Sequence, residues 1–107
     1  MLKSRGMTVK HVRSPKLLAL AKGQLCVVCH ADDGTIVAAH SNLLEHGKGM
    51  GIKAHDCMSA WLCFRCHSEY DQGGSMTKEE KREFIMSAIC KTVIKLWQNE
   101  YIKIQQT

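Results

Sequence analysis

The stretch Cys63-Phe64-Arg65-Cys66-His67-Ser68-Glu69-Tyr70-Asp71 joins a closely spaced pair of cysteines to a histidine and an aspartate. A second pair with the same spacing, Cys26-Val27-Val28-Cys29, lies upstream. The C-x-x-C spacing lets two sulfurs face one ion, and two such knuckles supply the tetrahedral sulfur set that structural zinc prefers. The spacing therefore predicts a zinc site made of Cys26, Cys29, Cys63 and Cys66, with a small subdomain held between the knuckles.

Two other chemistries share parts of this pattern. Residues 63–67 also match the c-type haem attachment motif, but that attachment requires export and leaves the upstream pair unexplained. A thioredoxin-like redox pair is disfavoured because the chain lacks an alternating βαβ pattern. Cys57 and Cys90 fit neither knuckle, and we expect both to be small core hydrophobes.

Length and composition predict one small domain. The chain has 107 residues, of which 45% are hydrophobic and six are cysteine. A core of this size usually needs a metal or disulfide staple. No run of 18 apolar residues exists, so a membrane span is not expected. The N-terminus lacks the apolar region of a secretory signal, which favours a cytoplasmic protein with reduced cysteines.

The positive charge is concentrated at the N-terminus. The net charge is +5, and residues 1–31 hold six basic residues and no acidic one. We expect a flexible basic arm over 1–13, followed by a single domain over 14–107, with DNA as the polyanionic partner. A solvated tail without a partner is the alternative. The candidate nucleic-acid contacts are Lys3, Arg5, Lys10, Arg13, Lys48 and Lys53.

The short elements predict an α+β fold. Ser14 and Pro15 are typical of a helix start, and Asp33-Gly34 of a tight turn between strands. The glycine-rich stretch 41–56 has no regular pattern. The expected elements are a helix over 15–22, a hairpin of strands over 24–29 and 35–39 that ends at His40, a strand over 57–62 and a helix over 64–70.

The last third predicts one long helix. Thr77 and Glu80 form a capping-box pattern, and no Pro or Gly follows, so the helix should run from Lys78 to about Tyr101. Its apolar residues cover more than one face, which requires partners on more than one side. Those partners are either the rest of the domain or a second copy of the chain.

A histidine at a strand end and a helical metal pair suggest phosphodiester hydrolysis. His40 ends an expected strand, while His67 and Asp71 are four residues apart and share one helix face. Such a histidine can accept a proton from water, and a metal can neutralise the phosphate and stabilise the leaving oxygen.

The order of these motifs resembles the HNH, or ββα-metal, nucleases. More closely, it is similar to the small phage and prophage nucleases of the YbcO-like family, over about Lys16 to Tyr101. The resemblance implies a zinc-bound HNH-like fold with a short N-terminal and a long C-terminal helix. It also implies a metal-dependent endonuclease of phage or prophage DNA metabolism or recombination, acting in the cytoplasm of a bacterial host cell. The four cysteines match the zinc ligands, His40 the catalytic histidine and His67 the metal-ligand position.

One position departs from that pattern. Many HNH enzymes place a metal-binding Asp directly before the catalytic histidine, and here that residue is Ala39. Asp71, Asp56 or Glu69 would have to supply the carboxylate to a catalytic Mg²⁺, Mn²⁺ or second Zn²⁺. The alternative function is a non-catalytic zinc module that binds nucleic acid or a protein.

Overall fold

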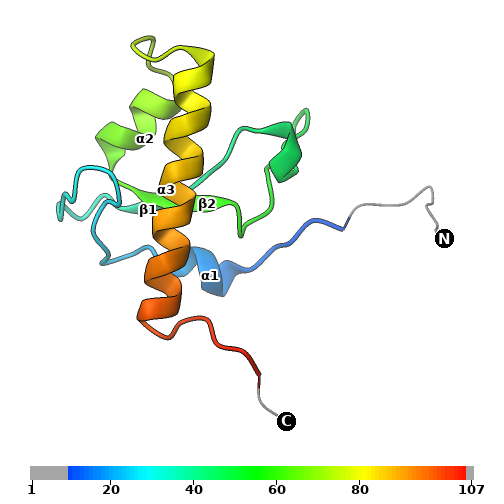
Figure 1. Cartoon of the computed structure of the whole chain (residues 1–107), viewed down its shortest axis with the longest axis vertical. Helices are drawn as coiled ribbons and strands as arrows, with labels where there is room; N and C mark the ends of the chain where they lie inside the picture. The colour runs from blue at the N-terminus through cyan, green and yellow to red at the C-terminus, as the bar shows by residue number, and fades with distance from the viewer. Residues whose placement is uncertain (1–9, 106–107) are drawn as a thin grey trace.

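The computed structural model describes residues 10–105 and shows a small α+β fold with one two-stranded sheet and three α-helices (Figure 1). The α+β expectation is confirmed. The elements are α1 (Pro15–Ala19), β1 (Val37–His40), a 3₁₀ turn (Leu44–His46), β2 (Ser59–Leu62), α2 (Phe64–Asp71) and α3 (Lys78–Gln98).

The sheet pairs two strands that are far apart in sequence. β1 and β2 are antiparallel, with Val37 opposite Leu62 and His40 opposite Ser59. Cys63 directly follows β2, so the strand pair has the cysteine cluster beyond one end and His40 at the other. α3 packs against β2 and crosses in front of the sheet in Figure 1.

The expected hairpin between residues 24–29 and 35–39 is wrong, although a strand does end at His40. Residues 26–31 curl into a knuckle, in which the His30 N–H donates to the Cys26 carbonyl and the Cys26 N–H to the Ala31 carbonyl. A chain that turns two sulfurs toward one point cannot also run extended. The knuckle instead meets the edge of β2, where the Val27 N–H donates to the Trp61 carbonyl.

The helix starts are confirmed and the ends differ slightly. The Ser14 side chain accepts a hydrogen bond from the Leu17 N–H, and the capping box of Thr77 and Glu80 is formed. α1 ends at Ala19 and continues as turns to Gly23, which has a φ of +87° that favours glycine. α3 ends at Gln98, three residues before the expected Tyr101.

The core lies where α3 covers the sheet. The buried residues of α3 are Ile85, Ala88, Ile89, Thr92 and Leu96. Thr92 is polar, and its Oγ1 accepts from the Trp61 N–H at 3.1 Å and donates to the Ala88 carbonyl at 2.9 Å. This hydroxyl satisfies a backbone group on the edge of β2 that the two-stranded sheet leaves unpaired.

The expected burial of Cys57 and Cys90 does not hold. Cys57 and Cys90 are both exposed, so neither is a core hydrophobe. Ile94 and Trp97 of α3 are about half exposed, so the described chain does not cover every apolar face of this helix. Among residues 10–105, no helix has the length and apolar character that a membrane span requires.

Candidate metal centre and active site

The four predicted zinc ligands converge. The sulfurs of Cys26, Cys29, Cys63 and Cys66 all lie within 4.8 Å of one another, and Cys29 Sγ is 3.6 Å from Cys63 Sγ. A tetrahedral zinc with bonds of about 2.3 Å places its sulfurs about 3.8 Å apart. The cluster therefore has the dimensions of a Zn²⁺ site, and the predicted ligand set is confirmed as one that could hold zinc.

Two of the four thiols have shifted pKa values. A backbone hydrogen bond at Ala31, helped by the sulfurs of Cys63 and Cys26, lowers the pKa of Cys29 to about 6. Burial, with neighbouring thiols, raises the pKa of Cys66 above its ordinary value. A divalent cation would favour the thiolate form of both sulfurs.

His40 is paired with a buried carboxylate. Nε2 of His40 lies 2.8 Å from Oδ1 of Asp56, and Asp56 is 3% exposed. Burial raises the pKa of this carboxyl, but hydrogen bonds from His40 and from the Ser14 N–H outweigh it and hold the pKa below its ordinary value. Because an ionised carboxylate can only accept, the His40 nitrogen that faces it carries the proton.

The segment before α1 holds Asp56 in place. The Ser14 N–H donates to Asp56 Oδ2 at 2.7 Å, and Arg13 Nη1 lies 3.4 Å from Oδ1. Arg13 also donates to the carbonyls of Ala54 at 2.7 Å and Lys53 at 2.8 Å. Both carboxylate oxygens of Asp56 are thus occupied by protein donors, which suits orientation of His40 better than coordination of a metal.

The candidate nucleic-acid residues differ in their contacts and exposure. Residues 11–13, which belong to the expected arm, contact residues 47 and 53–56 of the domain. Arg13 donates hydrogen bonds within the protein, and its side chain is 42% exposed. Lys10 and Lys53 are exposed and Lys48 is half-buried, whereas Lys3 and Arg5 lie outside the described residues.

The second predicted pair lies on α2. His67 Nε2 is 3.3 Å from Asp71 Oδ2, and both side chains are more than one-third exposed. Ligand atoms at cis positions around Mg²⁺ are about 3.0 Å apart, so this pair has the spacing to share one cation. The Asn42 side chain donates to Asp71 Oδ1 at 3.0 Å, and the Asn42 N–H donates to the Tyr70 hydroxyl at 2.8 Å.

Asn42 is a residue that sequence reasoning did not select. It lies two positions after His40, in the segment that leaves β1. Its contacts nevertheless fix the chain leaving β1 against the end of α2. In the sequence, Asn42 is only an amide close to the strand-end His40. Nothing in that position indicates that its partner is Asp71, 29 residues away on α2.

The other carboxylate candidate, Glu69, and the departing position Ala39 lie in environments that do not suggest metal binding. Glu69 accepts a hydrogen bond from the Ser75 hydroxyl, and Ala39 is 1% exposed in the core. Apart from the four cysteines, residues 10–105 contain no group of three His, Cys, Asp or Glu side chains that converge. A catalytic metal would thus rest on His67 and Asp71, with water or substrate as further ligands.

Comparisons with known proteins give one match. A family model described as "Putative nuclease YbcO" matches residues 15–101, which cover α1 to the residues just beyond α3. No curated protein and no solved structure matches significantly.

Proposed function

This chain belongs to the YbcO nuclease family, and from that premise we propose that it is a metal-dependent endonuclease that hydrolyses DNA phosphodiester bonds in an HNH-like manner. The observation that carries the proposal is the pairing of His40 with buried Asp56. The His40 side chain is only 17% exposed, and the carboxylate that orients it is itself held by Ser14 and Arg13.

The proposed general base is Nδ1 of His40. Asp56 accepts the proton-bearing Nε2–H, which leaves the lone pair on Nδ1 to take a proton from water. The Asp56 carboxylate then stabilises the imidazolium that forms. In this scheme Asp56 is a positioning residue and does not bind the metal.

The proposed metal ligands are His67 Nε2 and Asp71 Oδ2. A bound Mg²⁺, Mn²⁺ or second Zn²⁺ would supply positive charge for the phosphate and the leaving oxygen. Asn42 supports this pair because its amide fixes the second oxygen of Asp71. It also links the pair to the strand end that carries His40.

DNA as substrate is supported by the positive charge of the chain. The net charge of +5 favours a polyanion, and the exposed Lys10 and Lys53 flank the segment that holds Asp56. The four-cysteine site takes a structural part, because its ligand set is complete and leaves no open position for substrate.

The test is plasmid nicking with Mg²⁺, Mn²⁺ or Zn²⁺ added. Wild type should nick DNA, and His40→Ala should lose about 10²–10⁴-fold in rate while it keeps its zinc and a cooperative unfolding transition. Lys78→Gln, purified in parallel, is the surface control and should cleave normally. Equal cleavage by His40→Ala and wild type would remove His40 from the mechanism.

A non-catalytic zinc module is the second candidate, and buried Ala39 is the observation that favours it. This reading predicts one tightly held zinc, DNA or protein binding, and no nicking with any of the three metals. The nuclease reading predicts a second, weaker divalent site that Asp71→Asn removes.

A further inference from the structure

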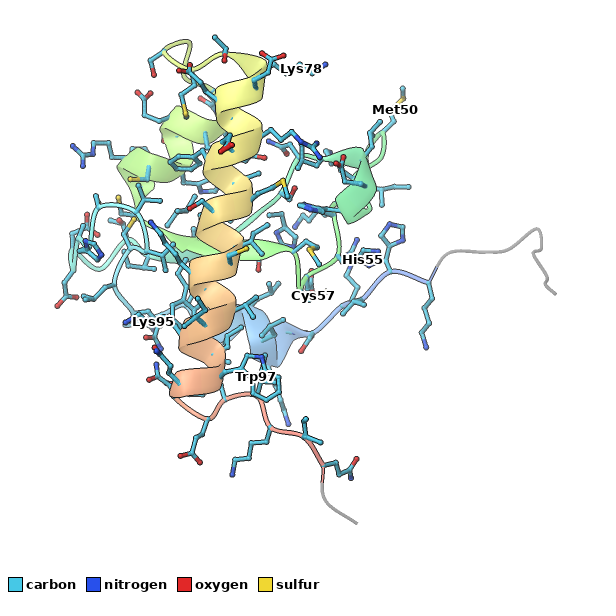
Figure 2. The ribbon with its side chains drawn as sticks, viewed as in Figure 1. Met50, His55, Cys57, Lys78, Lys95 and Trp97 are labelled. Atoms are coloured by element: carbon cyan, nitrogen blue, oxygen red, sulfur yellow. The ribbon has the colours of Figure 1, made fainter. Side chains whose placement is uncertain are left out.

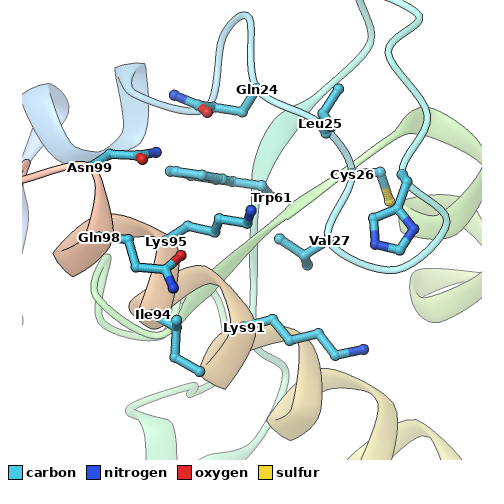
Figure 3. A pocket seen from close by; sticks show the side chains of 11 residues that line it. Gln24, Leu25, Cys26, Val27, Trp61, Lys91, Ile94, Lys95, Gln98 and Asn99 are labelled. Carbon is cyan, nitrogen blue, oxygen red and sulfur yellow. The ribbon is translucent and has the colours of Figure 1, made fainter.

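A cleft of about 500 Å³ lies between the cysteine knuckle and the C-terminal half of α3 (Figure 3). Trp61 of β2 and Val27 of the knuckle contribute its buried apolar surface, and Leu25 and Ile94 contribute half-exposed apolar side chains. The polar lining consists of Gln24, His30, Lys91, Lys95, Gln98 and Asn99. None of the residues proposed for catalysis lines this cleft.

The charged side chains of the lining are two lysines, and the lining also includes the cluster residue Cys26. Lys91 and Lys95 are four residues apart on α3 and therefore share one helix face. Neither lysine has an ion-pair partner among the side chains that the structure describes, and no Asp or Glu lines the cleft. Two unpaired ammonium groups beside low-dielectric walls favour an anionic ligand.

The rest of the lining indicates a planar group with polar edges. The amides of Gln24, Gln98 and Asn99 each offer a donor and an acceptor, which are the groups that base edges present. Gln24 Nε2 is held 3.3 Å from the Tyr101 hydroxyl. Apolar walls suit the faces of such a ring, and the volume suits a small ligand but not a duplex.

We propose that this cleft binds one unpaired nucleotide of a nucleic-acid strand, with its phosphate on Lys91 and Lys95 and its base between the apolar walls. The strand as the source of the nucleotide rests on the proposed function. Binding itself does not require cleavage, so a failure of this inference is distinguishable from a failure of the nuclease reading.

The experiment follows Trp61 fluorescence in the zinc-loaded full chain. The chain has two tryptophans, so a His40→Ala/Trp97→Phe variant leaves Trp61 alone and blocks cleavage. A short single-stranded oligonucleotide should change the Trp61 emission at saturation. A nucleoside monophosphate should bind more weakly and change the emission only at higher concentration. Inorganic phosphate and a blunt-ended duplex without unpaired bases should leave the emission unchanged. An equal response to phosphate alone would reduce the cleft to an anion site and overturn the proposal, as would a preference for duplex.

Matched lysine pairs test the position of the site. Lys91→Gln/Lys95→Gln should weaken single-strand binding about tenfold at low salt and shrink the salt slope by about 0.7, the value for one phosphate of a single strand. Lys78→Gln/Lys81→Gln removes the same charge from the other end of α3, where Figure 2 shows Lys78 far from Lys95. This control variant should bind the oligonucleotide with the same affinity as the protein without lysine substitutions. An equal loss of affinity in both variants, or no loss in Lys91→Gln/Lys95→Gln, would show that the cleft is not the site.

Discussion

Oδ1 of Asp56 lies 2.8 Å from Nε2 of His40, although the two residues are 16 positions apart in the chain. The contact joins the end of β1 to the loop before β2. Ser14 and Arg13, which precede α1, hold the Asp56 carboxylate in position. A carboxylate in this position determines which imidazole nitrogen is free to accept a proton.

Asp56→Asn tests that relationship through the rate. The pKa of Asp56 lies below its ordinary value, so the carboxyl is ionised at neutral pH and accepts the Nε2–H of His40. Asp56→Asn should lower the rate about 10–100-fold, because the neutral amide does not stabilise the imidazolium that forms during the reaction. The measurement is the nicking rate at one metal concentration, and a rate equal to that of wild type would separate Asp56 from His40.

The same carboxylate contributes to stability in a defined direction. A depressed folded-state pKa adds stability above the unfolded value of about 3.9, and this stability is lost as the pH falls through the folded pKa. The stability advantage of wild type over Asp56→Asn should therefore shrink as the pH falls below about 4, and denaturant unfolding at a series of acid pH values measures it.

His67→Ala should weaken the activating metal. The concentration of Mn²⁺ that gives half-maximal cleavage should rise about 10–100-fold, and excess Mn²⁺ should restore part of the rate. Asp71→Asn should behave alike, since both side chains face one position. Glu69→Gln is the matched carboxylate control on the same helix and should leave the metal requirement unchanged. The opposite ranking of the two acidic variants would assign the site to Glu69.

Cys63→Ser should lose zinc and most of the cooperative unfolding transition. The zinc affinity of such sites is also folding energy, on the order of 10 kcal/mol. Metal content and thermal unfolding measure this directly. Cys57→Ser and Cys90→Ser, which replace exposed thiols outside the cluster, should retain zinc and unfold like wild type. Normal unfolding of zinc-free Cys63→Ser would contradict the structural role of the cluster.

The basic residues before α1 should divide into two kinds. Deleting residues 1–9 removes Lys3 and Arg5 and should reduce the salt slope of duplex binding by up to about 2. Arg13→Ala should instead cost about 1 kcal/mol of stability, because Arg13 donates to the carbonyls of Lys53 and Ala54. Salt titrations and denaturant unfolding of both variants test the division. A slope change in Arg13→Ala larger than in the deletion would reverse it.

Thr92→Val should destabilise the fold by about 1–3 kcal/mol. Valine has nearly the same shape but leaves the buried Trp61 N–H without an acceptor. Thr92→Ser keeps the hydroxyl and is the control, so it should lose less. Denaturant unfolding compares the two, and a valine variant as stable as wild type would show that another acceptor replaces the hydroxyl.

The sequence predicts best what local chemistry determines. The cysteine spacing identifies the ligand cluster, and the capping box identifies the first turn of α3, because each signal lies within a few residues. The hairpin prediction fails because the pairing of strands is not local. Asp33-Gly34 indicates a turn, but it does not indicate which segment pairs with the strand that follows. β1 pairs with β2, a contact that closes a long loop and has no local signature.

The partners of His40 are likewise non-local. Asp56 was a candidate metal ligand, because an isolated carboxylate in a sequence does not show whether its oxygens are free. Only the fold shows that Ser14, Arg13 and His40 occupy both of them. The exposure of Cys57 and Cys90 could not be predicted from the sequence either, since cysteine occurs both in the core and on the surface.

α2 carries Cys66 and His67 side by side, one buried in the cysteine cluster and the other partly open to solvent. Successive helical residues point in directions about 100° apart. A metal held by the cysteines would fix the orientation of α2 about its axis and, with it, the directions of His67 and Asp71. One side of the helix would thus anchor it to the cluster, while the other side carries the histidine and the aspartate.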